Sequence, residues 1–70
     1  MNIKLGEYEH FKGKRYRVIG AAKHSETLEE IIVYEALYGE RELWARPAKM
    51  FFEEIERDGM KMPRFKYVGK

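Results

Sequence analysis

The chain contains no cysteine, which excludes a disulfide framework and any zinc site with thiolate ligands. It also lacks a long hydrophobic run, because no stretch approaches the roughly 20 apolar residues of a membrane-spanning helix. The N-terminal stretch MNIKLGEYEH has no apolar core of the kind found in secretory signals. These absences predict a soluble cytoplasmic protein that does not associate with membranes.

A strong excess of one charge is absent as well, since 14 Lys and Arg residues stand against 12 Asp and Glu residues, a net charge of +2. Such a balance is weak support for nucleic-acid binding. The two signs are unevenly distributed along the chain. Lys12–Arg17 and Lys61–Lys70 are basic, whereas Ser25–Glu30 and Phe51–Asp58 are mainly acidic. If the basic segments lie side by side, one face of the protein is positive.

The length of 70 residues predicts a single domain, residues 1–70, with a thin core. A chain this short buries only about 60% of the surface that it exposes when unfolded. Five Tyr, four Phe and one Trp indicate that aromatic rings supply much of this core.

Glycine and proline divide the chain into short segments, a pattern that favours a small β-fold. Tyr8–Phe11 alternates between apolar and polar residues, and a turn around Gly13 follows. In the next strand, Gly20 predicts a bulge or a tight bend. Strict alternation along this strand places five residues on one face: Tyr16, Val18, Gly20, Ala22 and His24.

The middle of the chain is compatible with a helix or a strand. Thr27–Glu30 has the spacing of a capping box, and the apolar residues after it fall at helical intervals as far as Ala36. Against a helix, Ile31–Tyr34 combines three β-branched residues with an aromatic one, which favours a buried strand. We expect the strand, then a turn at Gly39–Glu42 and another strand at Leu43–Arg46.

The segment from Pro47 onward carries both a helical and a hairpin signal. Proline suits the first turn of a helix, and Asp58-Gly59 is a strong hairpin turn. One helical turn over Pro47–Phe51 followed by a hairpin satisfies both signals. Pro63 then lies on an edge strand or near a strand end.

Four motifs in this order, HSET (His24–Thr27), VYEALYG (Val33–Gly39), LWARP (Leu43–Pro47) and MFFE (Met50–Glu53), carry a resemblance. The chain resembles, over about residues 6–65, a family of small bacterial proteins known as domain of unknown function 1653. The resemblance implies a compact SH3-like barrel or roll and no particular reaction. The expected fold is therefore mainly β, with five or six short strands and one short helical turn near Pro47.

The polar segment His24, Ser25, Glu26, Thr27 contains residue types that perform acid–base and nucleophilic chemistry. Consecutive side chains on an extended chain point in opposite directions, so they rarely converge as a catalytic set. The simpler interpretation is a turn in which the Ser25 and Thr27 hydroxyls cap backbone N–H groups. A ligand-binding loop, or a small hydrolase with His24 as general base, is the rival interpretation.

Trp44 and Arg46 alternate along one predicted strand and therefore share a face. Together with Tyr34 they are suited to hold a carboxylate, a phosphate or a stacked base. The alternative is that Trp44 closes the core and Arg46 pairs with a glutamate.

The turn KGKRYR interleaves cations with an aromatic ring, as nucleic-acid-binding segments do. It contributes Lys12, Lys14, Arg15 and Arg17 as candidate phosphate contacts, although it also suits an ordinary solvated turn. In the acidic run that begins at Phe51, we expect Phe51 or Phe52, with Ile55, to point inward.

We expect a non-enzymatic binding or accessory module without a catalytic residue, metal or cofactor. Its partner is a protein, a nucleic acid or a small anionic ligand, and the chain is a monomer or a weak dimer paired through a strand edge. Nucleic-acid binding at the basic turn is the sharper alternative.

Overall fold

The computed structural model describes residues 3–69, which form seven strands and one short helix. Among these residues, no helix is long and apolar enough to cross a membrane. The expected mainly β fold with a helical turn after Pro47 is confirmed, with seven strands instead of five or six. The elements are β1 (Gly6–His10), β2 (Arg15–Lys23), β3 (Glu30–Ala36), β4 (Leu43–Pro47), α1 (Ala48–Phe51), β5 (Glu54–Arg57), β6 (Met60–Pro63) and β7 (Phe65–Gly69).

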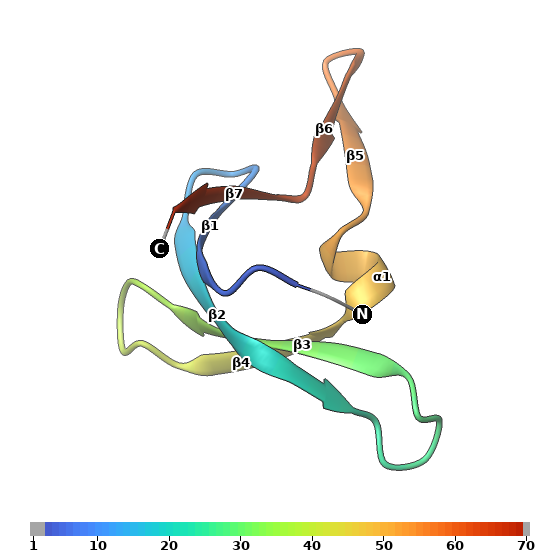
Figure 1. The fold of residues 1–70 in the computed structure, drawn as a ribbon. Helices are drawn as coiled ribbons and strands as arrows, with labels where there is room; N and C mark the ends of the chain where they lie inside the picture. The colour runs from blue at the N-terminus through green and yellow to red at the C-terminus, as the bar shows by residue number, and fades with distance from the viewer. Residues whose placement is uncertain (1–2, 70) are drawn as a thin grey trace.

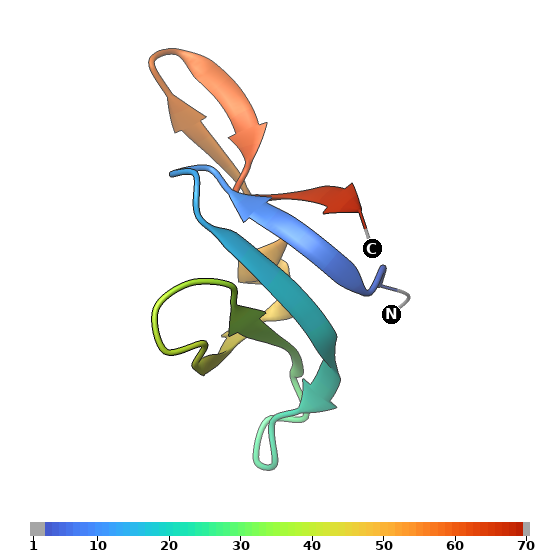
Figure 2. The ribbon, with the colours of Figure 1, turned by 90° about the vertical axis from the view of Figure 1, so that its left-hand side faces the viewer.

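Five strands form one antiparallel sheet in the order β4-β3-β2-β1-β7. The sheet is strongly curved, and α1 lies on its concave side (Figure 1). Within the described part of the chain, β4 and β7 are the two edges and do not pair, so the expected barrel is not closed. β5 and β6 form a separate two-stranded ribbon that projects away from the sheet (Figures 1 and 2).

The strand interpretation of the middle segment is confirmed, because Ile31–Tyr34 lies within β3. Ile32 and Tyr34 point into the core, at 0% and 4% exposure, and Val33 between them is half-buried. A period of two therefore accounts for burial here, as a β-branched run favours. Of the two capping-box residues, Thr27 lies in the loop before β3 and Glu30 begins the strand; the Thr27 Oγ1 accepts a hydrogen bond from the Glu29 N–H at 3.2 Å.

The predicted irregularity at Gly20 is confirmed, since the pairing of β2 with β3 shifts register between Val18 and Gly20. This bulge overturns the strict alternation expected along β2. Ala21, and not Ala22, lies opposite the core residue Ile32, because the extra residue exchanges the two faces of the strand beyond it.

The helical turn and the hairpin after Pro47 are both confirmed. Asp58 and Gly59 have φ angles of 55° and 77°, as a two-residue hairpin turn requires. Pro63 ends β6, in a two-stranded ribbon where it interrupts no interior ladder.

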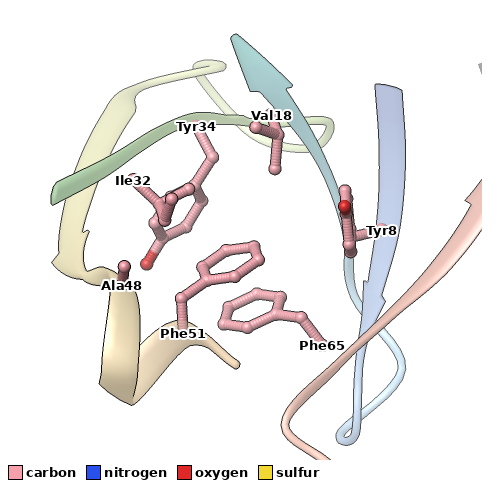
Figure 3. Packing of buried hydrophobic residues seen from close by; sticks show 7 residues of the cluster. All are labelled: Tyr8, Val18, Ile32, Tyr34, Ala48, Phe51 and Phe65. Atoms are coloured by element: carbon pink, nitrogen blue, oxygen red, sulfur yellow. The ribbon is translucent and has the colours of Figure 1, made fainter. Parts of the chain in front are cut away.

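The core is largely aromatic and is built around Phe51 and Phe65. Their rings stack at a centroid distance of 4.1 Å and an interplanar angle of 3°, in the middle of the cluster (Figure 3). Tyr8 and Tyr34 meet the Phe51 ring edge-on at 5.5 and 5.3 Å. Phe51 is fully buried whereas Phe52 is 40% exposed, which resolves the alternative left open in the sequence.

Trp44 does not close the core, contrary to one expectation, and 49% of its surface is exposed. It lies opposite Tyr34 on the inner face of β4, but β4 is an edge strand, and no strand of residues 3–69 pairs with its outer side. The large aromatic residue at the centre of the core is instead Phe51, which α1 contributes.

Candidate functional site

The His24–Thr27 segment forms an exposed loop held by its own hydrogen bonds. The His24 Nδ1 accepts hydrogen bonds from the backbone N–H groups of Glu26 and Thr27, at 3.1 and 3.3 Å. The Leu28 N–H donates to the His24 carbonyl oxygen at 2.9 Å, and the His24 N–H donates to the Glu29 carbonyl oxygen at 2.8 Å. This geometry favours the turn interpretation. Thr27 caps a backbone N–H group as expected, and the second capping side chain is His24 where the sequence suggested Ser25.

The loop lies at the opposite end of β3 from the loop that connects β3 to β4 (Figure 1). Trp44 lies opposite Tyr34 and Arg46 opposite Ile32, farther along the strand. The structure therefore brings Tyr34, Trp44 and Arg46 together, but not His24–Thr27 with them.

Arg46 is half-buried and lies against aromatic groups. Its Nε donates a hydrogen bond to the Tyr34 hydroxyl at 3.4 Å, and its guanidinium carbon lies 5.8 Å from the centre of the Phe65 ring. Within residues 3–69 it has no carboxylate partner, so the expected pairing with a glutamate is wrong. A guanidinium in this position keeps donors available for an external anion.

The structure divides the basic turn into two pairs of residues. Arg15 and Arg17 lie 3.7 and 3.0 Å from carboxylate oxygens of Glu7, on the face of the sheet opposite the core. Lys12 and Lys14 instead lie over aromatic rings, 5.8 Å from the centre of Phe11 and 4.6 Å from the centre of Tyr38. The four residues therefore do not form one basic patch.

Tyr16 connects the aromatic groups near these cations. Its ring contacts His10, Tyr34, Tyr38 and Phe65 at centroid distances of 5.3 to 6.3 Å. Its hydroxyl lies 2.6 Å from the Tyr38 hydroxyl. His10 extends the series to Phe11, whose ring also has the Arg57 guanidinium 5.9 Å from its centre. We call this set the aromatic–basic surface: His10, Phe11, Lys12, Lys14, Tyr16, Tyr38, Arg46 and Arg57.

Two titratable groups of this surface, His10 and Tyr16, have pKa values shifted toward their uncharged forms. Burial lowers the pKa of His10, and the charges of Arg46, Arg64 and Lys12 lower it further. The His10 Nδ1 accepts the Lys12 N–H at 3.2 Å, so its ring proton belongs on Nε2. Burial, together with the hydrogen bond to Tyr38, raises the pKa of Tyr16 to about 12. Neutral rings are thus surrounded by positive charges.

Arg64 stands behind this surface and is already paired. Its Nη2 lies 3.1 Å from the Glu53 Oε1, and its Nε is buried without a hydrogen-bond partner. It adds positive potential at His10 without offering a free guanidinium.

Two pockets adjoin the aromatic–basic surface. One has a volume of about 450 Å³ between the β5–β6 ribbon and the end of β1, and is lined by Glu9, His10, Phe11, Met62, Pro63 and Lys66. The other has a volume of about 200 Å³ and is lined by residues 36 and 38–42, with Trp44. His24 lines neither pocket. Over residues 3–69, no group of three or more His, Asp or Glu residues is placed to hold a metal ion.

Several residues of this surface carried no clear signal in the sequence. His10 and Phe11 precede the basic turn, while Arg57 is distant from it, so only the fold brings them together. The register of β1 and β2, with Tyr8 opposite Tyr16 and Glu7 opposite Arg17, decides which cations face the rings.

Comparisons with known proteins agree with this fold. A family described as a protein of unknown function (DUF1653) matches residues 6–67. Among solved structures, the chain is similar to a crystal structure of a protein belonging to DUF1653 from Bordetella bronchiseptica. The two are 33% identical with a TM-score of 0.88, over 97% of this chain and 90% of that one. No curated protein matches the chain.

Proposed function

The chain belongs to the DUF1653 family of proteins of unknown function, and we propose that it is a non-catalytic module that binds single-stranded nucleic acid. The binding site is the aromatic–basic surface. One observation supports the proposal most directly: cations on this surface lie over aromatic rings, and within residues 3–69 they have no carboxylate partner.

The cations of the outer face provide the contrast. Arg15 and Arg17 both form ion pairs with Glu7, and Arg41 forms one with Glu35 at 3.6 Å. On the aromatic–basic surface, by comparison, no ion pair occurs within residues 3–69 for Lys12, Lys14, Arg46 or Arg57. Their charge is therefore available to phosphates, while the neighbouring rings provide faces on which unpaired bases stack.

Single strands fit this surface better than a duplex does. Stacking on a side chain requires a base whose face is free, and the bases of a duplex already stack on each other. Because contacts between cations and phosphates release counterions, we expect binding to be strongest at low salt. If all four cations contact phosphates, the logarithm of the affinity falls against the logarithm of salt concentration with a slope of about −2.8.

The test is fluorescence anisotropy of a labelled mixed-sequence single strand, titrated with the protein at several salt concentrations. We expect Lys14→Gln and Arg46→Gln each to weaken binding and to make the slope shallower by about 0.7. Arg15→Gln removes the same charge from the outer face and serves as the matched control, with the slope unchanged.

Circular dichroism verifies that each variant is folded. Failure of the wild-type protein to bind the strand at low salt would refute the proposal. Equal effects of Lys14→Gln and Arg15→Gln would place the binding site elsewhere.

A further inference from the structure

We infer that the 200 Å³ pocket between Tyr38 and Trp44 receives one base of the bound strand, with a preference for guanine. This inference rests on the proposed function and adds base selectivity to it. The argument depends on the size of the pocket, its walls, its position and the chemistry of its rim.

The size of the pocket limits the occupant to one small group. Pockets for drug-sized ligands have volumes of about 300–1,000 Å³, and this one is smaller. Its shape is supported by the backbone: the Ala36 N–H donates to the Glu42 carbonyl oxygen at 2.9 Å, and the Arg41 N–H donates to the Tyr38 carbonyl oxygen at 3.1 Å. The pocket therefore exists before any ligand binds.

Two exposed aromatic side chains line the pocket. Tyr38 is 38% exposed and is held by Tyr16 and Lys14. Trp44 is 49% exposed, and within residues 3–69 its indole contacts no other aromatic ring. A large ring exposed beside a pocket is available to stack on a planar ligand.

The pocket is continuous with the aromatic–basic surface. Tyr38 belongs to both, and Trp44 lies two residues before Arg46 on the same face of β4. A strand whose phosphates contact Lys14 and Arg46 therefore passes the mouth of the pocket.

The rim of the pocket offers hydrogen-bond acceptors. The carboxylates of Glu40 and Glu42 have no ion-pair partner in the described part of the chain, whereas Arg41 is occupied by Glu35. A carboxylate accepts hydrogen bonds and donates none, so the rim selects a base edge that carries donors. The guanine edge presents N1–H and the 2-amino group side by side. Adenine and cytosine present one amino group, and the N3–H of thymine lies between two carbonyl oxygens that a carboxylate repels.

The experiment uses short thymidine strands that differ only in one central base: guanine, hypoxanthine, adenine, cytosine or thymine. A single central guanine avoids four-stranded structures. Two readouts are recorded for each strand, the affinity from anisotropy and the intrinsic fluorescence of Trp44, which is the one tryptophan of the chain.

We expect the strand with guanine to bind about tenfold more tightly than the all-thymidine strand, as a good two-donor contact provides. Hypoxanthine, which lacks the 2-amino group, falls between them. Guanine also changes the Trp44 fluorescence most. Glu40→Gln or Glu42→Gln removes most of the guanine preference without weakening the thymidine strand. Glu54→Gln, an exposed glutamate of the β5–β6 ribbon, leaves the preference intact and is the matched control.

The outcomes separate this inference from the proposed function. Tight binding of all five strands with equal affinity overturns the guanine pocket and leaves nucleic-acid binding in place. Absence of binding by every strand overturns both. If N-acetyl-lysine methylamide changes the Trp44 fluorescence while the strands do not, the pocket accepts a cationic side chain of a protein, and the inference is wrong.

Discussion

Phe51 and Phe52 are adjacent residues of one type with opposite environments, so they provide a sharp test of the core. Phe51 is fully buried against Phe65, Tyr8 and Tyr34, and Phe52 is 40% exposed. Truncating a buried phenylalanine to alanine costs about 3–5 kcal/mol. A domain of this length has a free energy of unfolding of about 4–10 kcal/mol, so Phe51→Ala brings the protein close to unfolding. Leucine refills part of the volume, and Phe51→Leu should cost about 2–3 kcal/mol.

Thermal unfolding followed by circular dichroism measures this difference. Because each kcal/mol lowers the Tm of a small domain by about 4–8 °C, Phe51→Leu should lower it by roughly 10–20 °C. Phe52→Leu should cost less than about 1 kcal/mol and lower the Tm only slightly. Equal losses in the two variants would refute the arrangement of the core around the Phe51–Phe65 stack.

Two further predictions concern titratable groups of the aromatic–basic surface. Because the folded-state pKa of His10 lies below its usual value, the unfolded chain binds more protons in that range. The stability advantage of the wild type over His10→Gln should therefore decline as pH falls through about 6.5. An NMR titration of the His10 ring with its midpoint at or above that value would contradict this expectation. In Tyr38→Phe, the pKa of Tyr16 should fall from about 12 but stay above the usual value of 10.0, because Tyr16 remains buried. An NMR titration of the Tyr16 ring measures this pKa. An unchanged pKa would show that the contact between the two hydroxyls is absent.

Features that depend on local sequence were predictable. The β-branched run Ile31–Tyr34, the turn at Asp58-Gly59 and the irregularity at Gly20 each follow from backbone preferences of a few consecutive residues. The structure has all three where the sequence places them. The resemblance to the family added the barrel-like architecture, although the sheet stays open between β4 and β7.

Features that depend on strand order were not predictable in the same way. Trp44 has the large apolar side chain that is typical of a core residue, and only its position on the edge strand explains its exposure. Likewise, KGKRYR presents four cations in the sequence, and Glu7, from another strand, neutralises Arg15 and Arg17. The pairing register between distant strands decides which cations remain available to a ligand, and composition gives no information about that register.

The arrangement of β1, β7 and the β2–β3 loop has a consequence for engineering the chain. Glu7 in β1 and Gly69 at the end of β7 lie opposite each other in the sheet, and the segment before β1 leads away from β7 (Figure 1). The loop at residues 24–29 lies at the far end of an exposed ribbon, away from the aromatic–basic surface (Figure 2). Exposed loop tips tolerate new termini and inserted domains. A circular permutant in which a flexible linker connects Gly69 to Ile3, opened between Ser25 and Glu26, should therefore fold, and a reporter domain attached in the opened loop would leave the surface unobstructed.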